Sequence, residues 1–150
     1  MTKQVSVLAH NIRSLHNVGA IFRTCDGAGV SKLYLTGYSG VPPRKEISKT
    51  ALGAEESVPW EYHPDPLELM KELKNRGVQL LALEINEASQ SIFEFEPTYP
   101  CCLIIGNEVD GVEPELLELC DAILHIPMRG MKDSLNVSVA FGIGAYGLTK

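Results

Sequence analysis

The chain is 150 residues long, with 45% hydrophobic and 21% charged residues. These values are typical of a single soluble globular domain that can bury a core without disulfides or metals. The formal net charge of −6 argues against a protein that coats nucleic acid along its length, because phosphate binding needs clustered lysine and arginine. A local basic patch is still compatible with that charge.

Membrane and secretory segments are not recognisable in the sequence. No apolar run approaches the roughly 20 residues of a membrane span, and the N-terminal segment does not resemble a secretory signal. The four cysteines, Cys25, Cys101, Cys102 and Cys120, show no Cys-x-x-Cys spacing. We therefore expect reduced, mostly buried thiols in a cytoplasmic protein without a membrane partner.

Hydrophobic periodicity predicts alternating strands and helices in the first half of the chain. The segment 18–28 has an apolar helical face, with Asn17 placed to cap its amino end and Gly29 its carboxyl end. The Gly- and Pro-containing stretch 36–50 is predicted to be a loop. The elements predicted here are a strand at 4–9, a polar loop at 10–17, the helix at 18–28, and strands at 32–35 and 58–62.

The second half continues this alternation. Asp65 and Pro66 provide a cap and a first-turn proline for a helix that Gly77 ends. The order predicts an α/β domain over residues 1–150, with a mostly parallel sheet and helices on both faces. The elements predicted here are a helix at 66–76, a strand at 79–83, a loose segment to residue 99, a strand at 101–105, a helix at 114–120, a strand at 122–126 and a helix at 135–148.

The segment 11–30, NIRSLHNVGAIFRTCDGAGV, has two interpretations. One is a capped amphipathic helix with a solvated arginine. The other gives Arg23 a function, because it lies off the apolar face about 9 Å along the axis from Asn17, at 1.5 Å per residue. Helical side chains lean toward the amino terminus of the helix. A long arginine can therefore return to the edge of the sheet at which the strands end and near which Asn17 lies.

The segment 103–117, LIIGNEVDGVEPELL, places Glu108 between Gly106 and Gly111, directly after an apolar strand. Glycines on both sides of a carboxylate indicate a tight turn whose backbone approaches another group closely. A plain turn between a strand and a helix would explain the same residues.

The segment 126–148, IPMRGMKDSLNVSVAFGIGAYGL, is a polar loop followed by a helix of small and apolar residues. A loop with Arg129, Lys132, Ser134 and Asn136 suits ligand binding better than a core, because ligands bind at the carboxyl ends of strands in α/β sheets. Ser134 could also cap the helix.

Two other patterns are misleading. Glycines 142, 144 and 147 spell GxGxxG, but no βαβ unit follows them, so we exclude a dinucleotide site and expect close packing, for example across a subunit interface. The four histidines lack the spacing of metal ligands, and no metal is expected. They are His10, His16, His63 and His125.

Three motifs in these segments resemble, in order, the signatures of the SpoU/TrmH family of RNA 2′-O-ribose methyltransferases, in the SPOUT superfamily. They are N-x-G-x-x-x-R-T from Asn17, GNEVDGV from Gly106, and IPM with SLNVSVA from Ile126. The stretch 48–60, SKTALGAEESVPW, also resembles the family's segment between the first two signatures. The resemblance implies a C-terminal trefoil knot of the SPOUT type, an obligate homodimer, and S-adenosyl-L-methionine bound in the knot. Without it we would expect an open doubly wound sheet, since threaded chains are rare.

The resemblance further implies methyl transfer to a ribose 2′-hydroxyl in tRNA or rRNA. A guanidinium stays protonated at neutral pH, so Arg23 is better interpreted as a group that orients the substrate, with the proton acceptor open. The implied active-site residues are Asn17, Arg23, Glu108, Ser134 and Asn136. The residues implied to bind S-adenosyl-L-methionine, the methyl donor, are Leu83, Gly106, Gly111, Ile126, Met128 and Leu135.

Many members of this family carry an added RNA-binding domain or terminal extensions, and neither is recognisable here. RNA contacts are then expected from the catalytic dimer itself. The basic residues expected to contact RNA are Arg13, Arg44, Lys45, Lys49, Arg129 and Lys132. The alternative is a non-catalytic RNA-binding or ribosome-assembly factor that keeps the fold, which the intact set of active-site residues argues against. The choice between tRNA and rRNA, the modified nucleotide and any accessory protein stay open.

Overall fold

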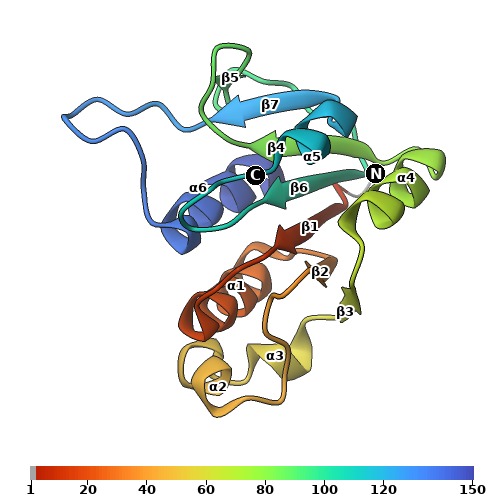
Figure 1. Cartoon of the computed structure of the whole chain (residues 1–150), viewed down its shortest axis with the longest axis vertical. Helices are drawn as coiled ribbons and strands as arrows, with labels where there is room; N and C mark the ends of the chain where they lie inside the picture. The colour runs from red at the N-terminus through yellow and green to blue at the C-terminus, as the bar shows by residue number, and fades with distance from the viewer. Residues whose placement is uncertain (1–2) are drawn as a thin grey trace.

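A computed structural model describes residues 3–150. Its centre is a seven-stranded sheet in the order β3-β2-β1-β6-β4-β7-β5 (Figure 1). All pairings between these strands are parallel, which confirms the predicted parallel sheet. The strands are β1 (Val5–His10), β2 (Lys32–Thr36), β3 (Trp60–His63), β4 (Gln79–Leu83), β5 (Gln90–Ser91), β6 (Cys101–Ile105) and β7 (Ala122–His125).

Helices cover both faces of the sheet, as predicted (Figure 1). Because side chains alternate along a strand, Val7 and Leu8 of β1 enter two separate cores. The Val7 core packs against α1, α2, α3 and α6, and the Leu8 core against α4 and α5. The helices are α1 (Leu15–Ala28), α2 (Lys45–Ala51), α3 (Ala54–Ser57), α4 (Pro66–Asn75), α5 (Pro114–Leu119) and α6 (Val137–Thr149).

The start of α1 differs from the prediction. The helix begins at Leu15, and Ser14 caps it by accepting a hydrogen bond from the backbone N–H of Asn17 at 3.1 Å. The prediction that Asn17 is the cap was therefore wrong. With Ser14 satisfying this N–H, the Asn17 side chain is available to the loop after β6. The end of the helix agrees with the prediction, with Gly29 at φ 74°.

Residues 36–50 are not wholly a loop, because α2 begins at Lys45, and α3 follows it. Ile47 and Ala51 of α2 are buried against α1. The approach is close, since a Cβ on Gly19 of α1 would lie 2.3 Å from the Ile47 carbonyl oxygen. A seven-residue helix has little stability alone, so its existence depends on this packing, which local periodicity did not reveal.

The cysteines agree with the expectation of free thiols. Cys25, Cys101 and Cys102 are buried, Cys120 is half-buried, and all four are free. Burial raises the pKa of the Cys101 thiol to about 11, so this thiol is protonated and unreactive at neutral pH. Within residues 3–150 no helix is long and apolar enough to cross a membrane.

Candidate active site

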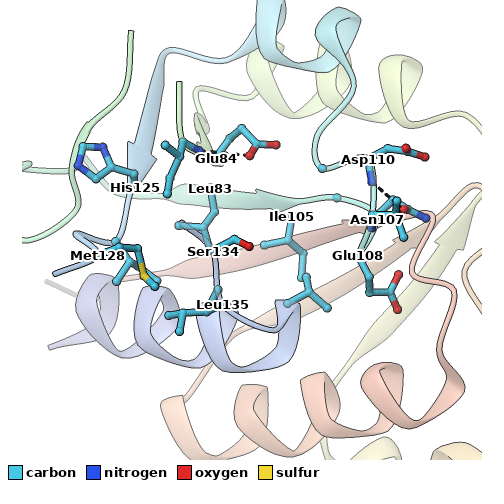
Figure 2. A pocket seen from close by; sticks show the side chains of 17 residues that line it. Leu83, Glu84, Ile105, Asn107, Glu108, Asp110, His125, Met128, Ser134 and Leu135 are labelled. Carbon is cyan, nitrogen blue, oxygen red and sulfur yellow. Dashed lines mark hydrogen bonds between the residues drawn. The ribbon is translucent and has the colours of Figure 1, made fainter. Parts of the chain in front are cut away.

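A pocket of about 230 Å³ lies at the carboxyl ends of β4, β6 and β7, beside the start of α6. This is the edge at which parallel α/β sheets bind ligands. Figure 2 shows Leu83, Ile105 and Leu135 between an end with His125 and an end with Glu108. Aliphatic side chains dominate the middle of the pocket, where Ser134 and Glu84 also lie, and His125 and Glu108 mark its two ends (Figure 2).

The loop that follows β6 is folded back on itself. Asn107 and Gly111 exchange backbone hydrogen bonds of 3.1 and 2.9 Å. A Cβ on Gly106 would lie 2.2 Å from the Gly111 carbonyl oxygen, and one on Gly111, at φ +73°, would lie 2.1 Å from Oε2 of Glu84. That Glu84 oxygen accepts a hydrogen bond from the Val112 N–H at 2.8 Å. Both glycines are thus required by close approaches, as predicted for this turn.

Glu108 joins this loop to the amino end of α1. Its carboxylate accepts hydrogen bonds from the backbone N–H groups of Arg13 and Ser14, both at 2.9 Å, and from Nδ2 of Asn17 at 3.0 Å. Partial burial raises the pKa of Glu108, but these three donors together outweigh it, so the pKa lies below its usual value. Glu108 is therefore an anion that fixes the geometry between the pocket and α1.

Asn107 connects the same loop to the ends of β1 and β2. Its Nδ2 donates to the Asn11 carbonyl oxygen at 3.0 Å and to the Tyr38 hydroxyl at 2.5 Å. Its Oδ1 accepts from the N–H groups of Val109 and Asp110 at 2.7 and 3.0 Å. Both polar atoms of the Asn107 side chain are hydrogen-bonded within the protein, so this residue holds the pocket loop in place.

The loop 126–136 closes the pocket from the side of α6. Ser134 lines the pocket, and the helix cap is Asn136, whose Oδ1 accepts from the Ser138 N–H at 2.9 Å. The interpretation of Ser134 as the cap was therefore wrong, and α6 starts at Val137 instead of residue 135. Because Asn136 takes the cap, the Ser134 hydroxyl can face the pocket.

These walls suit a nucleoside-like ligand. A flat heterocycle can pack between the aliphatic side chains of Leu83, Ile126 and Leu135, while backbone groups of the loop 106–111 offer hydrogen bonds. Residues 3–150 contain no group of three or more His, Cys, Asp or Glu side chains that could hold a metal ion.

A family model described as the SpoU rRNA Methylase family matches residues 4–146. The chain belongs to this family. The matched range contains all three motifs, so the family resemblance seen in the sequence is confirmed.

Several relatives of the chain are named as methyltransferases of tRNA or rRNA. It is 41% identical over 145 residues to the tRNA (guanosine(18)-2′-O)-methyltransferase of Aquifex aeolicus, covering 96% of this chain and 68% of that protein. It is 37% identical to an enzyme of the same name from Thermus thermophilus, covering 93% and 71%. It is 36% identical to the 23S rRNA (guanosine-2′-O-)-methyltransferase RlmB of Vibrio parahaemolyticus, covering 85% and 51%.

Solved structures share the fold along almost the whole SpoU chain. The Aquifex aeolicus TrmH/SpoU tRNA modifying enzyme superposes with a TM-score of 0.88 at 39% identity, covering 99% of this chain and 75% of that one. An AdoMet-bound rRNA methyltransferase from Sinorhizobium meliloti gives 0.92 at 28% identity, covering 99% and 56%. AviRb from Streptomyces viridochromogenes, solved with AdoMet, gives 0.90 at 27%, covering 99% and 60%.

The donor-binding residues predicted from the sequence come together in space. They come from three separate parts of the SpoU chain, and all of them line the single pocket described above. They are Leu83, Gly106, Gly111, Ile126, Met128 and Leu135.

The predicted catalytic residues are divided between the pocket and α1. Glu108 and Ser134 line the pocket, and Asn17 reaches it through its hydrogen bond to Glu108. Arg23 is exposed on α1, and its side chain forms no hydrogen bond or ion pair within residues 3–150. Asn136 stands at the end of the pocket-lining loop and caps α6.

The six predicted RNA-binding cations are all exposed, and none has a carboxylate within ion-pair distance in residues 3–150. Lysines elsewhere behave differently, because Lys32 is paired with Glu61 and Lys74 with Asp121. The exposed, unpaired cations are Arg13, Arg44, Lys45, Lys49, Arg129 and Lys132.

Sequence reasoning missed several residues of the pocket. Glu84 directly follows β4, and His125 is the last residue of β7, where its Nδ1 lies 2.9 Å from the Ser89 hydroxyl. Asp110 and Val137 also line the pocket. The signals that could have identified them are the strand ends for Glu84 and His125, and the second and third motifs for Asp110 and Val137.

Proposed function

We propose that this chain is an S-adenosyl-L-methionine-dependent methyltransferase that modifies a ribose 2′-hydroxyl in tRNA or rRNA. The observation that carries the proposal is the single pocket that unites the predicted donor-binding residues with Glu108 and Ser134. Family membership and relatives named as tRNA and 23S rRNA guanosine 2′-O-methyltransferases support it.

S-adenosylmethionine supplies an electrophilic methyl group on a sulfonium centre. In our proposal Leu83, Ile126 and Leu135 hold its adenine by apolar contact. Backbone groups near Gly106 and Gly111 bind its polar parts, and Met128 completes the wall. Structures of two relatives are described as containing AdoMet, which is consistent with this use of the pocket.

The acceptor hydroxyl needs placement in line with the methyl group and must lose its proton. We propose that Arg23 orients the RNA ribose or phosphate, because it is a free cation on the helix that Glu108 anchors. Ser134 and Asn136 would position the ribose from the loop 126–136. Asn17 would keep α1 in register with the pocket through Glu108.

We also propose a homodimer formed through α6. Val139 and Tyr146 of this helix are 51% and 54% exposed, and they share a face with half-buried Ile143. Tyr146 also lies against α1, where a Cβ on Gly27 would be 2.7 Å from its hydroxyl. An apolar face of this kind is typical of a subunit interface.

The chain is proposed to act as one SPOUT methyltransferase domain over residues 1–150, with α6 forming a C-terminal trefoil knot. In support, α6 returns from β7 across the sheet to pack against α1, β1 and β6, and Figure 1 shows the long connection between β7 and α6. The proposed RNA surface consists of the six free cations described above, and the proposed location is the cytoplasm, where tRNA and rRNA are modified.

Nucleoside mass spectrometry of total RNA from cells with and without the protein tests this function. We expect one 2′-O-methylated nucleoside to disappear from either the tRNA or the rRNA fraction. Calorimetry should show S-adenosylmethionine binding by the purified protein in the presence of a chelator. RNA binding without any methyl transfer would instead favour the non-catalytic assembly factor.

A further inference from the structure

The Tyr38 side chain is exposed to solvent but is held in place by hydrogen bonds. Its side chain is 59% exposed, yet its hydroxyl accepts a hydrogen bond from Nδ2 of Asn107, and its backbone N–H donates to Oδ1 of Asn11 at 2.9 Å. The preceding Gly37 has φ +65° and packs so tightly that a Cβ would lie 1.9 Å from that Asn11 oxygen. Both the backbone and the far end of the Tyr38 ring are therefore held, while much of the ring stays open to solvent.

A hydrogen bond links the Tyr38 ring to a residue of the pocket. Asn107, its hydrogen-bond partner, lines the pocket and precedes Glu108 in the sequence. A second exposed tyrosine lies beside it, because the Tyr62 hydroxyl of β3 donates to the Gly37 carbonyl oxygen at 2.6 Å. Aromatic surface thus extends from the Glu108 end of the pocket toward the edge strand of the sheet.

Charge near this surface suits RNA. The loop that carries Tyr38 leads through Arg44 into α2, which begins at Lys45 and also carries Lys49. These three cations are exposed and have no carboxylate partner in residues 3–150. Exposed lysine and arginine side chains of this kind bind RNA phosphates.

A fixed, exposed aromatic ring is the feature by which proteins bind unpaired bases. Its face is available at little entropic cost, and stacking of one base is worth about 1–3 kcal/mol. Bases inside an RNA duplex are already stacked and cannot use such a ring, so RNA loops are the usual targets.

We propose that Tyr38 stacks on an unpaired base of the substrate RNA next to the methylated nucleotide, so that the enzyme selects a single-stranded or loop site. This inference rests on the proposed function and names the structural class of its substrate. Tyr62 extends the same surface, and the α2 cations hold the adjoining phosphates.

The test compares three variants with the wild-type protein: Tyr38→Ala, Tyr38→Phe and, as a matched control, Phe93→Ala. Phe93 is 55% exposed and follows β5 at the opposite edge of the sheet. The probe is bulk undermodified tRNA or rRNA, whichever accepts methyl groups from labelled S-adenosylmethionine. The readouts are RNA Kd, single-turnover methylation, and donor Kd by calorimetry.

We expect Tyr38→Ala to raise the RNA Kd about 5- to 150-fold, which is the loss of one stacked base. Tyr38→Phe and Phe93→Ala should stay within about twofold of wild type, and the donor Kd should not change. A single-stranded oligoadenosine should compete with the RNA better than a duplex of equal length, and Tyr38→Ala should remove that preference.

Two results would overturn the inference. Unchanged RNA binding by Tyr38→Ala would exclude stacking, and equal losses in Tyr38→Phe and Tyr38→Ala would mean that the hydroxyl only supports Asn107. Either result would leave the proposed function intact if the wild-type protein transfers methyl groups. Absence of transfer by the wild type to both RNA fractions would instead contradict the proposed function.

Discussion

Nδ2 of Asn17 donates a hydrogen bond to Oε2 of Glu108 at 3.0 Å, across 91 positions of sequence. The same carboxylate accepts the N–H groups of Arg13 and Ser14, so one anion joins the residues that lead into α1, and Asn17 in its first turn, to the pocket loop. Because Arg23 lies two turns further along α1, the direction of this helix determines where its guanidinium can reach.

Glu108→Gln should lower the free energy of unfolding at pH 7 by roughly 1–2 kcal/mol. An amide has one accepting oxygen and no charge, so it cannot satisfy the three donors that the carboxylate serves, and bonds to charged groups are the stronger ones. Partial exposure of the side chain places the effect toward the lower end of the usual range. Urea denaturation measures it.

The pH dependence of this difference gives a sharper test. The pKa of Glu108 is lower in the folded protein than in the unfolded chain, so its stabilisation is complete above the unfolded-state pKa of about 4.3. It is lost as the pH falls through the lower, folded-state pKa. The gap between wild type and variant should therefore close on acidification below about pH 4. A gap independent of pH would contradict this assignment.

Arg23→Ala should reduce methyl transfer by about 10²–10³-fold, the usual loss for one preorganised group, while donor affinity stays unchanged. Since the side chain is exposed and unpaired, the free energy of unfolding should change by no more than about 0.5 kcal/mol. Single-turnover methylation, calorimetry and thermal melting measure the three quantities. Lys71→Ala, an exposed cation on α4 across the sheet, is the control and should keep full activity. Near-normal transfer by Arg23→Ala would remove this residue from the site.

Gly111→Ala should weaken donor binding, because it would displace the Glu84 carboxylate that accepts from the Val112 N–H in the pocket loop. Its Cβ would lie 2.1 Å from Glu84, and alanine at φ +73° is itself strained by about 1–2 kcal/mol. Gly77→Ala separates the two effects, because Gly77 has φ +84° but nothing within 4 Å of its Cβ position. Calorimetry should show normal donor binding by Gly77→Ala despite a similar loss of stability. Equal donor affinity in both variants would show that the turn does not shape the pocket.

Tyr146→Glu should convert the proposed dimer into a monomer, because a charge placed on the apolar face of α6 cannot be buried cheaply. Light scattering should give a mass near 16.4 kDa for this variant and twice that value for the wild type. Leu52→Asp, at a 64% exposed position after α2, should leave the mass unchanged. A monomeric wild type at micromolar concentration would contradict the dimer.

Removing both Lys45 and Lys49 should weaken RNA binding and reduce the slope of log K against log salt by about 0.7–0.9 per lysine. Lys32→Ala and Lys74→Ala should leave the slope unchanged, because those lysines are already paired with carboxylates. Filter binding over a range of salt concentrations measures the slopes. Equal slopes in all variants would place the RNA surface elsewhere.

The strands and the residues that line the pocket could be predicted to a large extent from the sequence and its family resemblance. Cys101–Ile105 and Gln79–Leu83 were predicted with their observed bounds, because apolar runs between turn residues are a local signal. The motifs at Gly106 and Ile126 follow directly after strands, and parallel strands end at one edge of a sheet. Local patterns therefore predicted the strand ends, and the family resemblance implied which residues at those ends meet in the pocket.

Only the tertiary structure decided which groups support that pocket. Ser14, and not Asn17, caps α1, and the Asn17 side chain instead bonds to Glu108, far away in the sequence. Helix α2 exists because its face packs against α1, and Glu84 reaches the loop that holds Gly111. Such contacts depend on distances between segments that no local periodicity encodes. The sequence and the family resemblance could therefore name candidate site residues, but not the hydrogen bonds that hold them in place.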